Sequence, residues 1–179
     1  MHGDTDWKSL DRRIGALLLI RNQRGEILLV LPSYRQNRGP LIWQLVGGGA
    51  HIGEHPTQAA LREGLEETGG TVPFIVGDLL LVDYTPPSKA GSAEGYNVVF
   101  DGGVVPNDTV VTLPAARPGE AEPELLDAAF VAREQLGDYC NAAQHRRVIE
   151  ALDALDDPSL RGNRFEGHRI EPLPALPTA

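Results

Sequence analysis

Hydrophobic and polar positions divide this chain into short apolar runs and two stretches with helical spacing. Two β-rich runs, Arg13–Ile20 and Glu26–Leu31, flank the polar segment Asn22–Gly25, which predicts a β-hairpin. The run Leu41–Val46 predicts a short strand ending at the glycines that follow it. Three further strands are expected over Phe74–Tyr84, Tyr96–Val105 and Leu125–Val131.

Two helices complete the expected elements. Pro56 suits a first helical position and Gly69-Gly70 suits a stop, so a helix is predicted from Pro56 to Thr68. Its buried side is expected to comprise Ala59, Ala60, Leu61 and Leu65. An amphipathic helix is predicted over Asn141–Leu155. Its apolar stripe comprises Val148, Ile149, Leu152 and Leu155.

The same pattern predicts one domain with two less structured ends. Residues 1–12 are interpreted as a polar N-terminal arm and residues 13–156 as the domain. From Asp157 the chain turns polar and proline-rich, so residues 157–179 are expected to form a loosely packed tail. The segment Pro106–Pro123 is rich in proline and acidic residues and is expected to be a long surface excursion.

The first predicted helix carries the most informative chemistry. Glu63, Glu66 and Glu67 are related by i, i+3 and i+4, which places three carboxylates on one helical face. Three like charges held together repel one another and contribute nothing favourable to folding by themselves. Divalent cations would remove the repulsion and could in turn bind a phosphate.

These residues belong to a longer spacing that resembles the signature of the Nudix hydrolases, GX5EX7REUXEEXGU, where U is a bulky aliphatic residue. All seven fixed positions are filled in register, by Gly48, Glu54, Arg62, Glu63, Glu66, Glu67 and Gly69. Gly64 and Gly70 depart from it, because they stand where aliphatic residues are expected. Gly64 should cost the helix about 1 kcal/mol relative to alanine and leave a core-facing slot without a side chain.

The order of elements is also similar to that of the Nudix family over roughly residues 13–156. The segment Trp43–Gly48 looks like the family's WELPGG lead-in, with Gln44 and Val46 replacing its glutamate and proline. The resemblance implies an α/β fold, a Nudix-like α/β/α sandwich with a mixed β-sheet. It also implies metal-dependent hydrolysis of a diphosphate that joins a nucleoside to another moiety.

Site residues follow from the resemblance. It implies that Glu63, Glu66 and Glu67 bind Mg2+ or Mn2+, with the Gly48 carbonyl as a further ligand. Either Glu63 or Glu67 would take the proton from water, and the sequence does not choose between them. Arg62 is expected to orient a carboxylate of the motif or to pair with Glu66, and Glu54 to hold the glycine loop against the helix.

Other candidates lie outside the motif. Glu120, Glu122 and Glu124 could supply a further carboxylate, and Glu124 is preferred because it directly precedes a predicted strand. His51 is interpreted as a loop histidine rather than a ligand, since imidazole suits zinc or iron better than magnesium. Candidate substrate-binding residues, each with an equally ordinary structural interpretation, are Arg35, Arg38, Trp43, Tyr84 and Lys89.

Charge and cysteine content narrow the functional classes. The net charge of −9 argues against non-specific nucleic-acid binding. No apolar run is long enough to span a membrane and no signal peptide is evident, so a cytoplasmic location is expected. The expected partner is a small-molecule diphosphate, with no nucleic acid and no membrane, and a homodimer is left open.

Two alternative functions are a non-catalytic nucleotide-sensing module and a prenyl diphosphate-processing enzyme. The second would need a reactive cysteine, and the single Cys140 lies far from the motif in sequence.

Overall fold

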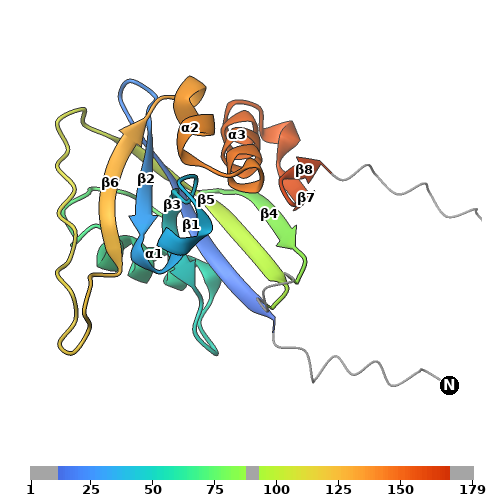
Figure 1. The fold of residues 1–179 in the computed structure, drawn as a ribbon. Helices are drawn as coiled ribbons and strands as arrows, with labels where there is room; N and C mark the ends of the chain where they lie inside the picture. Colours follow the sequence, from blue (N-terminus) through green and yellow to red (C-terminus); the bar gives the residue numbers. More distant parts are fainter. Residues whose placement is uncertain (1–11, 88–92, 170–179) are drawn as a thin grey trace, which may run out of the picture.

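A mixed β-sheet forms the centre of the protein in the computed structural model, which describes residues 12–87 and 93–169 (Figure 1). The strands are β1 (Arg13–Asn22), β2 (Ile27–Pro32), β3 (Gln44–Gly49), β4 (Leu79–Thr85), β5 (Gly95–Val105), β6 (Leu125–Val131), β7 (Gly162–Phe165) and β8 (His168–Arg169). Their order in the sheet is β6-β2-β3-β1-β5-β4-β7-β8. The pairs β1–β5 and β4–β7 are parallel and the other neighbours are antiparallel.

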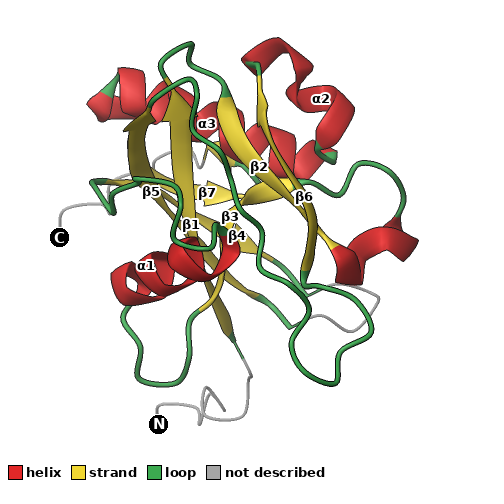
Figure 2. Cartoon of the chain, turned by 90° about the vertical axis from the view of Figure 1, so that its left-hand side faces the viewer, coloured by secondary structure: helices red, strands yellow, loops and turns green. Residues whose placement is uncertain are grey.

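Helices cover both faces of this sheet. They are α1 (Pro56–Glu67), α2 (Leu136–Tyr139) and α3 (Ala142–Asp156), with short 3-10 segments at Ser33–Arg38, Arg133–Gln135 and Pro158–Leu160. Figure 1 shows α1 on one side of the strands and α2 and α3 on the other, and Figure 2 shows the same helices (red) and strands (yellow) after a 90° turn. The arrangement confirms the predicted α/β/α sandwich with a mixed sheet. None of the helices in the described ranges is both long and apolar enough to cross a membrane.

Two hydrophobic cores result, one on each face of the sheet. Strand β1 contributes side chains to both cores, because successive side chains of a strand point to opposite faces. Leu17 and Leu19 join the core under α3, whereas Leu18 and Ile20 join the core under α1. Strand β1 is therefore apolar without interruption from Ala16 to Ile20, as expected for a sheet covered on both faces.

The first helix has a different buried side from the one predicted. Ala59 and Ala60 are fully buried, but Leu61 and Leu65 are about half exposed, at 49% and 48%. The buried positions of α1 also include Gly64 and Glu67. The helix is rotated so that part of the carboxylate face, rather than the leucines, is directed toward the sheet.

Gly64 does not leave an empty slot in the core. A Cβ atom at this position would collide with Cζ of Phe74 and lie 2.8 Å from Cδ1 of Leu18. The Phe74 ring therefore occupies the space that an aliphatic side chain at residue 64 would take. The departure from the motif is compensated by a residue that is distant in sequence.

The predicted strand Phe74–Tyr84 is wrong over its first half. Regular pairing begins only at Leu79. Residues 74–78 run beside β5 with isolated hydrogen bonds, from Ile75 N to Gly102 O at 3.1 Å and from Gly77 N to Asp101 O at 2.8 Å. Apolar composition alone did not reveal that Phe74 and Val76 pack against the core under α1 while the segment forms no continuous ladder.

The predicted tail is also wrong over residues 157–169. Strand β7 extends the sheet by parallel pairing with β4, and β8 turns back onto β7. Arg164 is only 4% exposed. Its guanidinium donates to Glu150 Oε2 at 3.0 Å and to Leu160 O at 2.6 Å. This short polar strand is held by ion pairs to α3, which hydropathy does not register. Residues 170–179 and the predicted arm over residues 1–11 lie outside the described ranges.

Candidate active site

The glycine run and helix α1 meet at Gly48. Strand β3 includes Gly47, Gly48 and Gly49, which were expected to follow the strand rather than to belong to it. A Cβ atom at Gly48 would lie 2.5–2.7 Å from the carboxylate atoms of Glu63. Only a residue without a side chain lets the backbone approach that carboxylate so closely. The start of α1 is set by Pro56 and by a capping box between His55 and Gln58.

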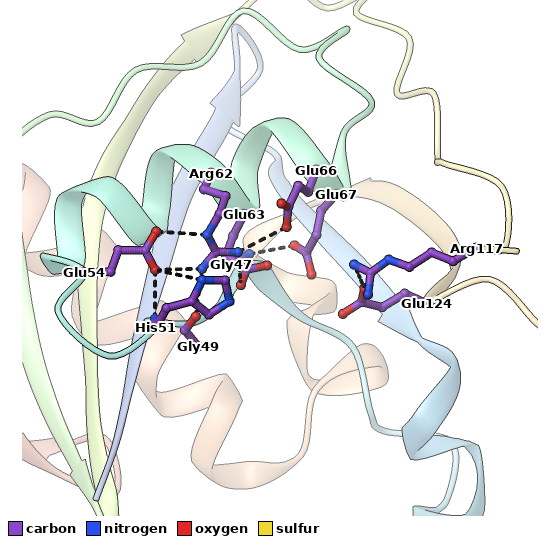
Figure 3. A network of polar contacts seen from close by, with 10 residues as sticks. All are labelled: Gly47, Gly49, His51, Glu54, Arg62, Glu63, Glu66, Glu67, Arg117 and Glu124. Atoms are coloured by element: carbon purple, nitrogen blue, oxygen red, sulfur yellow. Dashed lines mark hydrogen bonds and ion pairs between the residues drawn. The ribbon is translucent and has the colours of Figure 1, made fainter. Parts of the chain in front are cut away.

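Arg62 organises the carboxylates around this contact (Figure 3). Its Nε and Nη2 donate to the two carboxylate oxygens of Glu54 at 2.9 Å each, a bidentate pair. Its Nη1 donates to Glu63 Oε1 at 2.8 Å and to Glu66 Oε2 at 3.1 Å, and Nη2 also donates to Gly49 O at 2.9 Å. Both interactions considered for Arg62 therefore occur together.

Glu54 ties the loop to the helix, as its position in the motif implied. Besides the Arg62 pair, it accepts a hydrogen bond from the His51 backbone N–H at 2.8 Å. Arg62 first and this N–H second lower the pKa of Glu54 to about 2. The His51 side chain itself is 73% exposed, with Nδ1 4.0 Å from Glu54 Oε2. His51 thus contributes a backbone donor to the loop.

Burial raises the pKa of both inner carboxylates, Glu63 and Glu67, in contrast to Glu54. Glu67 is 6% exposed, and its Oε2 accepts a hydrogen bond from Gly47 N at 2.7 Å. Desolvation outweighs that bond and, with the nearby charges of Glu63, Glu124 and Glu66, raises the pKa of Glu67 to about 8. The pKa of Glu63 is also raised, mainly by desolvation and against the influence of Arg62. Negative charge is therefore costly at these two positions unless a cation is bound.

Two acidic residues from the long loop complete an acidic cavity of about 250 Å3. Glu124 lies just before β6 and its side chain is 47% exposed. The described residues around this cavity are Glu63, Glu66, Glu67, Pro114, Ala115, Arg117, Glu120, Glu124 and Leu125. Arg117 Nη2 donates to Glu124 Oε2 at 3.2 Å, and Figure 3 shows this pair beside Glu67. Glu122 instead accepts from Gln36 Nε2 at 3.1 Å and is absent from the described lining.

The acidic cavity suits a hard divalent cation in charge and donor type. Five carboxylates face one guanidinium there, and oxygen is the donor that Mg2+ and Mn2+ prefer. Within the described ranges, however, no three His, Cys, Asp or Glu side chains converge closely enough to hold an ion as they stand. Glu63 is engaged by Arg62 and Glu67 by Gly47. Binding of an ion would therefore require these side chains to rotate.

A second cavity, of about 350 Å3, opens on the α3 side of the glycine strand. Its charged lining consists of Arg13, Arg35 and Arg147, which we call the arginine cavity. Its polar lining includes Gln44, Asn97 and Gln144. Gly47, Gly48 and Gly49 form the wall nearest the motif. Gly48 thus lines this cavity while its backbone lies against Glu63 of the acidic one.

The predicted substrate-binding residues separate into different environments. Arg35 lines the arginine cavity. Trp43 packs against the core, and its ring meets that of Tyr139 edge-on at 5.3 Å. The Tyr84 hydroxyl donates to Glu94 Oε2 at 2.7 Å, and its ring packs beside those of Tyr96 and Phe165. Trp43 and Tyr84 are absent from the linings of the two cavities over the described residues. Lys89 lies outside the described residues, and only the backbone of Arg38 is described.

Sequence analysis missed Arg13, Arg147 and the cavity amides. Arg147 lies on the buried side of α3 and is 8% exposed. Its pairing with the fully buried Asp83, at 2.7 Å, is what permits a charged residue there. The available signal in the sequence was an arginine at the buried side of an otherwise apolar helical stripe. The aliphatic residues of that stripe drew attention away from it.

Cys140 offers no support for the prenyl diphosphate alternative. Its side chain is 2% exposed, and its Sγ lies 3.4 Å from Trp43 O. Desolvation raises the pKa of the thiol to about 12. Such a thiol is not a ready nucleophile or acid–base group, because the thiolate is its reactive form.

Comparison with known proteins agrees with this arrangement. An RNA pyrophosphohydrolase from Brucella ovis is 39% identical over 70 residues, which cover 37% of this chain and 39% of that protein, so the match spans about two fifths of the relative's length. A MutT protein from Methanosarcina mazei aligns with a TM-score of 0.60 and 25% identity, over 83% of this chain and 98% of that one. A NUDIX hydrolase from Nitrosomonas europaea shares the fold with a TM-score of 0.57 at 21% identity, over 85% of this chain and 93% of that one. The family model of the NUDIX domain matches residues 11–152, and the chain therefore belongs to the NUDIX family.

Proposed function

We propose that this chain is a divalent-metal-dependent pyrophosphohydrolase that cleaves a diphosphate linking a nucleoside to another moiety. The observation that carries the proposal is the acidic cavity, in which the carboxylates of α1 face Glu120 and Glu124 from a separate segment. The neighbouring arginine cavity, of about 350 Å3, is in the size range of small-molecule sites and could receive the rest of the substrate.

The proposed metal ligands are Glu63, Glu66, Glu67 and Glu124, with the Gly48 carbonyl as a further donor. When bound, Mg2+ or Mn2+ would offset the charge of the diphosphate and lower the pKa of water. Arg62 would then serve as a positioning residue, because it holds Glu63, Glu66 and the loop residue Glu54 in one network. Its removal should disorder all three carboxylates together.

Either Glu63 or Glu67 would accept the proton of the attacking water. Glu63 lies directly against Gly48, at the boundary between the two cavities. Glu67 is the more buried of the two and already accepts a hydrogen bond from Gly47. Metal affinity separates the two roles. A glutamine variant that loses turnover but keeps metal affinity identifies the base, whereas one that loses both identifies a ligand.

RNA with a 5′-triphosphate is a second candidate substrate. It is favoured by the Brucella ovis relative, which is named an RNA pyrophosphohydrolase and is 39% identical over 70 residues. The net charge of −9 weighs against a long RNA contact, so recognition would be confined to the 5′ end. A nucleoside triphosphate and a 5′-triphosphorylated oligonucleotide compared at equal concentration would separate the two candidates.

Metal dependence tests the proposal directly. Purified protein is incubated with nucleotide sugars, ADP-ribose, nucleoside triphosphates or a triphosphorylated oligonucleotide, each with Mg2+, with Mn2+ or with excess EDTA. Substrate and products are separated by ion-exchange chromatography and quantified, so that no coupling enzyme is needed in the EDTA samples. We expect turnover with at least one metal, loss of turnover in EDTA and recovery when metal is restored, because the clustered carboxylates repel a bare diphosphate. Turnover that persists in excess EDTA would overturn the proposed mechanism.

A further inference from the structure

The arginine cavity carries more positive charge than its own structure requires. The described residues that line it include three arginines and no carboxylate, in a protein with a net charge of −9. Arg147 is paired at 2.7 Å with Asp83, a carboxylate that is not part of the described lining. Three guanidinium charges against one carboxylate leave two positive charges uncompensated among these residues.

The charges of Arg147 and Arg35 both act on Arg13. The pKa of Arg13 is held below its ordinary value, first by partial burial of the group and then by the charges of Arg147 and Arg35. Among the described residues with the largest effect on Arg13, the carboxylate is that of Asp83, which acts in the opposite direction. Folding gains nothing from like charges gathered around a hollow, so an anion bound there would relieve the repulsion.

Arg35 also has unused hydrogen-bonding capacity. Its Nε is buried and has no hydrogen-bond partner among the described residues. The Gln144 amide lies beside Arg35. In the amide orientation that satisfies both of its groups, the Gln144 oxygen accepts from Arg35 Nη1 at 2.7 Å and the Gln144 nitrogen donates to Trp43 O. This amide therefore positions the Arg35 side chain without neutralising it. A buried guanidinium N–H without an acceptor is costly and fits a site that a ligand completes.

We infer that the arginine cavity is a second anion-binding site, which takes a phosphomonoester on the part of the substrate beyond the diphosphate. A phosphate dianion matches the two uncompensated positive charges, and its oxygens suit the planar donor groups of arginine. Gln44 adds an amide to the described lining, whereas the Asn97 amide nitrogen already donates to Thr85 Oγ1 at 3.0 Å. Gly48 lines the arginine cavity and lies against Glu63 of the acidic cavity, so one substrate could place its diphosphate beside Glu63 and its second phosphate near Arg35. This inference rests on the proposed function and specifies its substrate class.

Matched substrates that differ by one phosphate test this inference. ADP-ribose is compared with ADP-ribose 2′-phosphate, and dephospho-coenzyme A with coenzyme A, each by kcat/KM with Mg2+. We expect the phosphorylated member of at least one pair to be preferred about 10-fold or more, the size of one charge-assisted hydrogen bond. Equal kcat/KM within both pairs would overturn the inference while leaving the hydrolase proposal intact.

The Arg35→Met variant locates the preference. The substitution removes the charge and the N–H donors but keeps an unbranched side chain, so the preference should fall to within about twofold of unity. Arg13→Gln, at an exposed position, provides a second test if Arg35→Met fails to fold. Arg133→Gln is the matched control, because that arginine pairs with Asp153 at 2.7 Å and is not part of the described cavity lining. A preference that survives both cavity substitutions would contradict the assignment.

Binding without turnover separates the two proposals from each other. Titration calorimetry compares AMP with adenosine 2′,5′- and 3′,5′-bisphosphate on wild-type protein and on Arg35→Met, without metal. Tighter binding of a bisphosphate that depends on Arg35 supports the inference even where every diphosphate tested is stable. Inorganic phosphate is titrated in parallel. If it binds as tightly as the bisphosphates, the site serves free phosphate and the substrate assignment is wrong.

Discussion

The two cavities on either side of the Gly48–Glu63 contact are lined by charges of opposite sign. On the α1 side, five carboxylates surround a hollow with one guanidinium, and desolvation raises the pKa of both Glu63 and Glu67. On the α3 side, three arginines surround a hollow whose described lining contains no carboxylate. In each cavity the like charges repel one another when no ligand is bound, and a ligand of the opposite charge would reduce that repulsion. An anionic substrate bridged by cations on one side and held by arginines on the other satisfies both.

Loss of a motif carboxylate from the acidic cavity should have the largest effect on catalysis. Glu66→Gln and Glu67→Gln each remove one negative oxygen while nearly keeping shape, so kcat should fall by at least about 10^2-fold. Steady-state kinetics with the substrate found in the screen measure the loss, and circular dichroism checks the fold. Wild-type rates in both variants would reduce the carboxylate face to a solvated surface.

A methyl group at Gly48 should disturb the boundary between the cavities. The added Cβ would lie 2.5–2.7 Å from the Glu63 carboxylate and displace it, so Gly48→Ala should lower kcat by about 10-fold or more. Gly49→Ala is the matched comparison, since a Cβ there meets no atom within 4 Å. Kinetics of both variants should show the greater loss at residue 48. Equal losses would mean that the close approach of Gly48 to Glu63 is unimportant.

The functional part of the acidic cavity extends beyond the motif if Glu124 contributes to catalysis. Glu124→Gln should lower kcat/KM by about 10-fold, because it removes one of the charges facing Glu67. Glu122→Gln is the control, since Glu122 interacts with Gln36 and is not part of the described lining of the acidic cavity. Identical kinetics for the two variants would restrict the acidic site to α1.

The smallest expected effect concerns stability without metal. The pKa of Glu67 is about 8 in the folded protein, against 4.5 as the ordinary value. The folded state therefore binds more protons than the unfolded state between these values, so stability should decline as pH rises from about 4.5 to 8. Thermal unfolding in EDTA across this range measures the decline, and Glu67→Gln should reduce it. A stability profile in EDTA that is the same in both proteins would show that Glu67 is not the group responsible.

Much of the fold was predictable because its signals are local. The hairpin at Asn22–Gly25, the helix begun by Pro56 and the helix capped by Asn141 all appear as predicted. These features depend on turn chemistry, caps and periodicity within a few residues. The two wrong predictions of secondary structure, residues 74–78 as strand and residues 157–169 as tail, concern segments whose structure depends on distant partners.

The sequence alone determined the family and the carboxylate motif, because the motif is a fixed spacing along one strand–loop–helix unit. It also singled out Glu124, although only the structure brings that residue to the motif. Tertiary structure alone decided that Phe74 fills the space beside Gly64, that β7 and β8 extend the sheet, and that Arg13, Arg35 and Arg147 share one cavity. The three arginines lie on β1, on the segment after β2 and on α3. No local pattern encodes their proximity, which arises when the sheet pairs β1 with β3 and packs beneath α3.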